Sequence, residues 1–349
     1  MSKLIEALLN TKQCRGTKFD GVSLAGLDLS DCQFFECSFT NVDFSNALLE
    51  RSVFIGCDLT GMNFSSAQMI ETIFQGCALE NARFFGMTVT DAIFSKTSLV
   101  SVDFSNAILH KTAFDSCDLT RANFSEADLT LVAFMNSTVV YTNFMKANLR
   151  RSTMAGLDLS TAIFQASSLI ETYFEGSNLS GQAFKDCDLT STIFHKAILV
   201  NTDFSDRDLS GAFFSQADLS NSNFKGSKLK FVSFEKATVN KADLSGTVIE
   251  NSIFQEASLQ GTSFEEAQIS QCAFGKAVAT HGVWRNVTLE KSELSGASLD
   301  GSDFSSAKLT QINMHDVSQE KTLWDKSIFV DVKGTDPERL AAENWQPNT

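Results

Sequence analysis

Proline is nearly absent from this sequence of 349 residues: it occurs only as Pro337 and Pro347, near the carboxyl end. A proline has no backbone N–H and cannot donate to a sheet ladder. We therefore expect the N–H groups upstream of residue 337 to be needed for pairing. Tyrosine is equally scarce, with 2 residues against 31 phenylalanines. A single structural position that Phe fills repeatedly accounts for such a bias.

Basic residues are also in deficit. There are 28 Lys and Arg against 42 Asp and Glu, which gives a formal charge of −14. This charge argues against direct binding to nucleic acid or to an anionic membrane, and favours a basic partner surface. No apolar run is long enough to span a membrane, and residues 1–10 lack the features of a secretory signal. We expect a cytoplasmic protein, with secretion as an effector left open.

The motifs of catalytic chemistry are missing as well. The sequence contains no GxSxG, phosphate-binding loop or HExxH motif, and its four histidines are scattered. We therefore expect no enzyme, with no catalytic residue, no cofactor and no metal site. All cysteines except Cys14 share one small repeat position, and Cys37, Cys57 and Cys77 recur there at twenty-residue spacing. A metal or redox ladder is one interpretation. Small apolar fillers are favoured because no His or carboxylate shares this position.

What the sequence has instead is a period of five. Every fifth residue from Phe19 to Met314 is apolar, and the residue two positions earlier is mostly small, as at Cys32 and Ala47. Glycine and asparagine gather two positions after each apolar centre. A helix repeats every 3.6 residues and a strand every 2, so neither produces this period. The chain must turn a corner every five residues, with Gly or Asn at the corners.

This repeat resembles that of the pentapeptide-repeat family, as the segments Ala122-Asn123-Phe124 and Ala127-Asp128-Leu129 illustrate. The resemblance covers residues 17 to about 330. It implies an all-β solenoid: a right-handed, four-sided parallel β-helix of about 15 coils, with twenty residues per coil and short helical caps at one or both ends. The expected domains are a capping helix in residues 1–16, the β-helix in 17–330, and a capping helix and tail in 331–349.

The twenty-residue coil can be tested on the apolar centres. Phe recurs every twenty residues in two series, one through Phe44 and Phe64 and the other through Phe34 and Phe54. The two remaining series are mainly Leu, such as the one through Leu109. Opposite walls of the tube should therefore carry the same residue type, with Phe stacked on Phe.

Two segments depart from the regular repeat and lead to further predictions. Asp336 followed by Pro337 is typical of a helix start, and we expect Trp345 to seal the end of the tube after that helix. Around Gly282 the pattern weakens, because glycine takes an inward position and Trp284 replaces Phe. We expect a local bulge or bend there.

Two surface features are candidate sites. The first is an outward column that is apolar where equivalent positions are polar, and it is either a partner surface or a row of β-branched residues suited to strands. Its members are Val53, Ile73, Ile93, Tyr173, Ile193, Phe213 and Ile253. The second is an acidic patch, interpreted as functional or as a solvated face. Its members are Asp186, Asp188, Asp203, Asp206 and Asp208.

Two functions follow. The first is a non-enzymatic, rigid module for protein–protein interaction, acting as a scaffold, adaptor or effector, with a protein partner or a second copy as a homodimer. The second is implied by the resemblance, because some members of the family act on DNA gyrase: a DNA-mimicking modulator of gyrase or another type II topoisomerase. The net charge of −14 agrees with the second function.

Overall fold

The computed structural model describes residues 3–345, so Met1, Ser2 and residues 346–349 of the predicted terminal segments lie outside it. The chain is a parallel β-solenoid of about 16 turns with two short helices. It divides into two compact units. Unit 1 comprises Met1–Asn178 and Phe184–Cys187, and unit 2 comprises Leu179–Ala183 and Asp188–Thr349.

Backbone bridges show the four sides of each coil. Lys18 pairs with Ser38, Ser23 with Asp43 and Asp28 with Leu48, always in parallel and always twenty residues apart. Successive bridges start five residues apart, so each coil carries four of them. This confirms the predicted four-sided coil.

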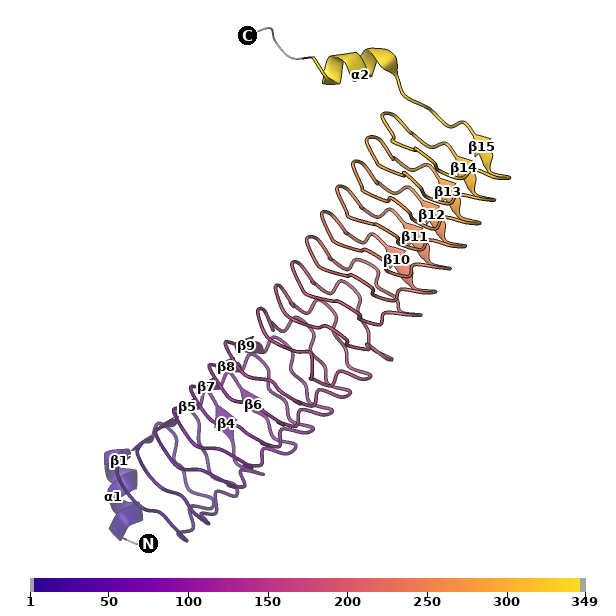
Figure 1. Cartoon of the computed structure of the whole chain (residues 1–349). Coiled ribbons are helices and arrows are strands. Elements are labelled where there is room, and N and C mark those ends of the chain that lie inside the picture. Colours follow the sequence, from indigo (N-terminus) through magenta and orange to yellow (C-terminus); the bar gives the residue numbers. More distant parts are fainter. Residues whose placement is uncertain (1–2, 346–349) are drawn as a thin grey trace. The chain divides into compact units, whose positions relative to one another are not determined.

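Unit 1 begins with helix α1 (Lys3–Thr11) and contains a seven-stranded parallel sheet in the order β1-β2-β3-β5-β7-β8-β9 (Figure 1). The strands of this sheet are β1 (Gln13–Arg15), β2 (Gln33–Phe35), β3 (Val53–Ile55), β5 (Ile73–Gln75), β7 (Ile93–Ser95), β8 (Ala113–Asp115) and β9 (Ala133–Met135). A second wall holds the pair β4 (Met69–Ile70) and β6 (Val89–Thr90).

Unit 2 contains a six-stranded parallel sheet and ends with helix α2 (Pro337–Glu343). The strands are β10 (Lys228–Lys230), β11 (Val248–Glu250), β12 (Gln268–Ser270), β13 (Thr288–Glu290), β14 (Lys308–Thr310) and β15 (Ile328–Val330). These strands lie five residues earlier in the twenty-residue coil than the strands of the seven-stranded sheet. The two units therefore form their regular sheets at different positions of the twenty-residue repeat.

The interior consists of stacked rings, as predicted. Phe74, Phe94 and Phe114 lie face to face, with ring centroids 5.0 and 5.1 Å apart. Rings of the opposite Phe wall meet them edge-on, as Phe104 meets Phe94 at 5.8 Å and 79°. Both geometries are favourable for aromatic pairs. The Leu walls fill the rest of the core, and Leu109 and Leu129 are fully buried.

The predicted bulge near Gly282 is wrong. Val283 pairs with Ser263 on one side and Asp303 on the other, so the twenty-residue register continues without interruption. Trp284 is buried and stacks on Phe264, with centroids 4.1 Å apart. A Cβ on residue 282 would lie 2.7 Å from Trp284 Nε1. Glycine at position 282 thus leaves space for the indole ring. The missing side chain at the inward position compensates for the larger ring that Trp284 places at a phenylalanine position.

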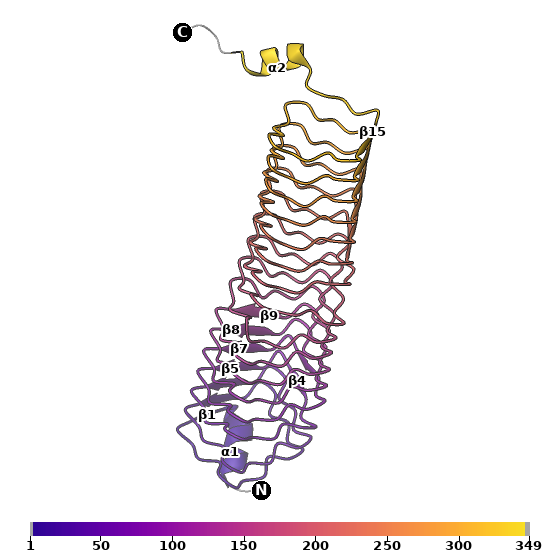
Figure 2. The same cartoon turned by 45° about the vertical axis from the view of Figure 1, so that its right-hand side comes forward.

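The two terminal helices behave differently. Ile5 and Leu8 of α1 are buried, as expected for a cap. Helix α2 starts as predicted, since Asp336 accepts hydrogen bonds from the N–H groups of Glu338 and Arg339. However, no residue of α2 is buried, and Figures 1 and 2 show it standing off the last coil.

The expected seal by Trp345 is therefore not formed, because this side chain is 71% exposed. Phe329 in the last coil stays 47% exposed for the same reason. Two polar contacts connect α2 to the solenoid: the buried His315 accepts from the N–H of Asp336 at 3.0 Å through Nδ1 and bonds Glu343 at 3.2 Å through Nε2. Helix α2 offers little apolar surface to cover a coil, since Leu340 is its one large apolar residue.

The Gly282–Trp284 pair yields a prediction. Gly282→Ala should destabilise the protein by about 1–3 kcal/mol, because the added Cβ overlaps the indole ring. In a Trp284→Phe background the same change should cost less, since Phe fits this wall and leaves space. Urea denaturation of the four proteins, followed by circular dichroism, measures both costs. Equal costs in the two backgrounds would refute the compensation.

Candidate functional site

The apolar column predicted from the sequence lies, in unit 1, on the outer face of the seven-stranded sheet. Val53, Ile73 and Ile93 are in register as direct Cα partners, and Ala113 and Ala133 continue the row. Two further bridges extend it through Thr153 to Tyr173. Val53 and Ile73 are half-buried, whereas Ile93 is 42% and Tyr173 46% exposed. The structure thus places these predicted residues side by side on one open face.

A second outward row was missed by the sequence reasoning. Phe35, Ile55 and Met135 lie at the third position of their strands and also face outward. A sequence signal was present for Ile55 and Met135, because alternate residues of a strand share a face and these two follow the column residues Val53 and Ala133 by two positions. The Arg15 guanidinium carbon lies 5.0 Å from the centroid of the Phe35 ring. The apolar face is therefore two residues wide over β3, where Val53 and Ile55 both face outward, whereas in β2 Phe35 shares the outer face with the polar Gln33.

In unit 2 the same column is less regular. Ile193 pairs with Phe213, and Ile253 is linked to Phe213 through Ser233. Phe213 is 48% exposed. These residues sit on isolated bridges and not on named strands, and beyond Ala273 the column becomes polar with Glu293, Asn313 and Lys333.

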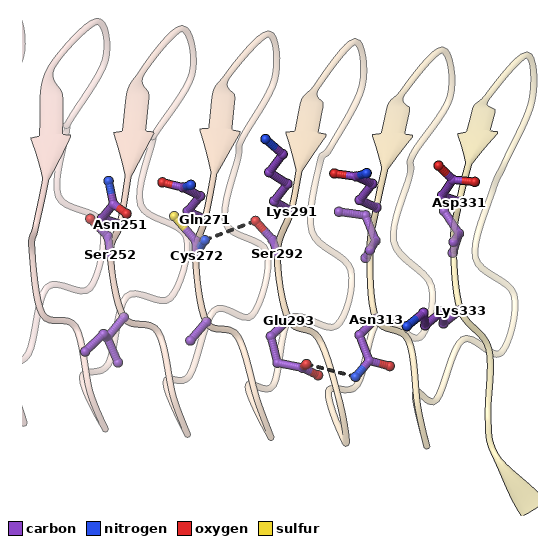
Figure 3. Close-up of a pocket in the computed structure, with 15 residues that line it drawn as sticks. Asn251, Ser252, Gln271, Cys272, Lys291, Ser292, Glu293, Asn313, Asp331 and Lys333 are labelled. Carbon is purple, nitrogen blue, oxygen red and sulfur yellow. Dashed lines mark hydrogen bonds between the residues drawn. The ribbon is translucent and has the colours of Figure 1, made fainter.

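At that polar end lies a groove of about 1080 Å³ (Figure 3). Three series of residues line it: the corner series that includes Asn251, Gln271 and Lys291, the small inward series that includes Cys272, and the outward column. Glu293 accepts a hydrogen bond from Asn313 Nδ2 at 2.8 Å. The groove is open, and its corner and outward series carry charges of both signs, so it has no single dominant ligand chemistry.

The acidic patch is divided between the units, since Asp186 belongs to unit 1 and the other four aspartates to unit 2. Asp188 accepts the N–H and the hydroxyl of Thr190 at 3.1 and 2.8 Å, and Asp208 accepts those of Ser210 at 3.0 and 2.6 Å. Such bonds are the usual means by which Asp stabilises a turn. At least these carboxylates thus have a structural role, and a functional role for the patch stays a prediction.

Metal ligands do not come together in residues 3–345: no three His, Cys, Asp or Glu side chains are placed to hold an ion. The seven cysteines of the small inward position are all buried, and none of the chain's cysteines forms a disulfide. Neither helix in the described part of the chain has the length and apolar character needed to cross a membrane.

Two family descriptions match the sequence. "Pentapeptide repeat region" matches residues 27–104 and 87–164. "Pentapeptide repeats (8 copies)" matches residues 167–206, 197–240, 242–278 and 285–317. Together the matches cover most of the chain. No curated protein matches it.

Solved structures with a similar fold include HetL, a pentapeptide repeat protein involved in heterocyst differentiation regulation in the cyanobacterium Nostoc. The match is 20% identical, covers 66% of this chain and 90% of HetL, and has a TM-score of 0.28. Rfr23 from the cyanobacterium Cyanothece is 20% identical over 42% of this chain and 91% of its own, with a TM-score of 0.23. QnrB1, a plasmid-mediated fluoroquinolone resistance protein, is 19% identical over 69% and 88%, with a TM-score of 0.22. These likenesses concern the fold alone.

The turn role of Asp208 leads to a pH prediction. Partial burial opposes ionisation, but the bonds from Ser210 and the charges of Lys228 and Lys230 outweigh it and lower the pKa of Asp208 below its ordinary 3.8. A carboxylate with a lowered pKa stabilises the fold above its ordinary pKa, and the contribution disappears as the pH falls through the folded value.

Asp208→Ala should therefore cost about 1 kcal/mol near neutral pH and less near pH 3, measured by urea denaturation at both pH values. Asp208→Asn is the matched control, because an amide oxygen still accepts the two bonds from Ser210 but does not titrate, so its cost should not change between the two pH values. A cost for Asp208→Ala that does not change with pH would contradict the assignment.

Proposed function

This chain belongs to the pentapeptide repeat family, and we propose that it is a non-enzymatic protein–protein interaction module. Its docking surface is the outer face of the seven-stranded sheet in unit 1. The observation that carries the proposal is that this parallel sheet has apolar side chains on its uncovered face.

Parallel sheets usually have both faces covered by other elements. The inner face of this sheet is covered, since Phe54, Phe74 and Phe94 stack beneath it. Its outer face carries Val53, Ile73 and Ile93 without cover. Covering an aliphatic side chain completely is worth about 1.5–3 kcal/mol, and these side chains are already partly buried, so each offers a partner roughly half of that.

The sheet of unit 2 shows that the repeat does not require apolar outward residues. Its outward side chains include Lys228, Lys230, Glu250 and Lys308, and Lys230 forms an ion pair with Glu250 at 3.0 Å. Strands of the same repeat thus form with charged outer faces. This weakens the alternative that Ile73 and Ile93 are apolar only because β-branched residues suit a strand.

Charge favours a different protein over a second copy as the partner. A homodimer would bring together two chains that each carry −14, which raises their mutual repulsion. A partner with a flat apolar surface and a basic rim would complement both the apolar sheet face and the negative charge of this chain. Scaffold, adaptor and effector roles are all compatible with such docking.

The test of this function is Ile73→Asp, which places a charge in the centre of the face. Partners captured from the source cells by wild-type protein should lose at least about tenfold in affinity for the variant, as expected for a central interface residue. Thr288→Asp is the matched control, because Thr288 is an equally half-buried first residue of a strand in unit 2.

Three results would contradict the proposal. Equal binding of the partner by wild type and Ile73→Asp would exclude the sheet face of unit 1 as the docking surface. A loss confined to Ile193→Asp would move the site to the column of unit 2. If sedimentation showed that the protein associates only with itself, the docking surface would bind a second copy of this chain and not a different protein.

A second candidate function is modulation of DNA gyrase by an acidic surface that mimics DNA, and the net charge of −14 favours it. In a supercoiling assay, this function predicts a change in gyrase activity, or in its inhibition by a quinolone, at micromolar concentrations of the protein. No effect at those concentrations would eliminate it. Ile73→Asp should leave this activity intact, which separates the two functions.

A further inference from the structure

Two cysteines meet at the amino-terminal end of unit 1. The Sγ atoms of Cys14 and Cys37 are 3.5 Å apart. Cys14 lies in β1 and is the Cα partner of Phe34 in β2, and Cys37 follows Phe34 by three residues. The pair therefore connects the first coil to the second.

This contact exists because Cys14 replaces phenylalanine. The equivalent wall position in the next coils holds Phe34 and then Phe54. In these coils the wall position is a phenylalanine, so the inward cysteines meet only one another: Cys57 interacts with the thiols of Cys37 and Cys77. Cys57 also donates to the carbonyl oxygen of Phe34, and Cys77 to that of Phe54, both at 3.3 Å. Cys37 is thus an ordinary inward cysteine with an unusual neighbour.

The two thiols differ in access and in chemistry. Cys14 is partly exposed, whereas Cys37 is buried. The hydrogen bond between them lowers the pKa of Cys37 and raises the pKa of Cys14. Cys14 therefore reacts first with a dissolved oxidant, because it is the accessible thiol of the two. Cys37 is the nucleophile of the second reaction, because it forms a thiolate more readily.

We propose that Cys14 and Cys37 form a reversible disulfide when a peroxide oxidises Cys14. The sulfur of Cys14 attacks a peroxide oxygen while its proton passes along the hydrogen bond to the Cys37 sulfur, the O–O bond breaks, and hydroxide or an alkoxide departs. Cys37 then attacks the sulfur of the resulting sulfenic acid, the S–O bond breaks, and the proton that Cys37 received from Cys14 joins the departing hydroxide as water. Two thiols are oxidised to one disulfide, and one peroxide is reduced.

Closing the bond requires the sulfurs to approach from 3.5 Å to about 2.05 Å. Strand β1 is free to make this movement, because it is the edge of the sheet and pairs only with β2. The bond would attach the segment of α1 and β1 covalently to the second coil. Oxidation would therefore hold the amino-terminal cap in place. The inference does not depend on the proposed docking function.

The experiment treats the reduced full-length protein with hydrogen peroxide and maps its disulfides by mass spectrometry after tryptic digestion. Wild type should lose two hydrogen atoms and show a peptide containing Cys14 linked to one containing Cys37. Because Cys32 shares the tryptic peptide of Cys37, a Cys32→Ser variant is included and should keep the cross-link. Dithiothreitol should reverse it.

Cys14→Ser and Cys37→Ser should lose the cross-link completely. Cys57→Ser, at the same inward position one coil later, should keep it. Serine is tolerated at this position, since Ser137 occupies it and donates to the carbonyl of Phe114 at 3.2 Å. In the oxidised wild type, amide hydrogen exchange in residues 13–17 should slow at least about tenfold.

Two results would overturn the inference. One is a cross-link that survives Cys37→Ser, which would mean that Cys14 pairs with another cysteine. The other is oxidation of wild-type Cys14 to the sulfinic acid without any disulfide, which would mean that Cys37 does not reach it.

Discussion

The parallel backbone ladder between residues twenty apart is the constraint on which the rest of the structure depends. Ile73 N–H donates to Ser52 and Ile93 N–H to Thr72, and the same bond recurs from coil to coil within each unit. Parallel pairing in this register places each residue directly over its counterpart in the next coil. A slip of one residue would turn the buried phenylalanines outward, so the apolar interior and the ladder enforce the same alignment.

Because the register is constant, side chains are sorted into columns that vary independently. Inward columns have little freedom, and Phe94 and Phe104 repeat one pattern of stacked and edge-on rings through their neighbours. Outward columns carry no such restriction. Unit 1 uses this freedom for an apolar sheet face around Ile73, whereas unit 2 places Lys230 and Glu250 on its sheet. Function in such a fold is therefore sought in the columns that the core leaves free.

Exceptions within inward columns are tolerated when a neighbour compensates. Gly282 has no side chain and leaves space for the indole ring of Trp284, and the twenty-residue backbone register is kept at this coil. Cys14 replaces a phenylalanine, and the space admits contact with Cys37. The first exception preserves packing density. The second brings two reactive groups together. An exception in a regular column can therefore indicate a functional site, as a conserved motif does in a globular protein.

The sequence by itself determined the repeat, the four-sided coil, the residues of the core and the start of α2 at Asp336, because each depends on local spacing or on capping chemistry. Only the tertiary structure decided that Cys14 contacts Cys37. It also decided that α2 leaves the last coil open. These features depend on corner geometry and on contacts between residues in different coils, and a period of five does not encode either.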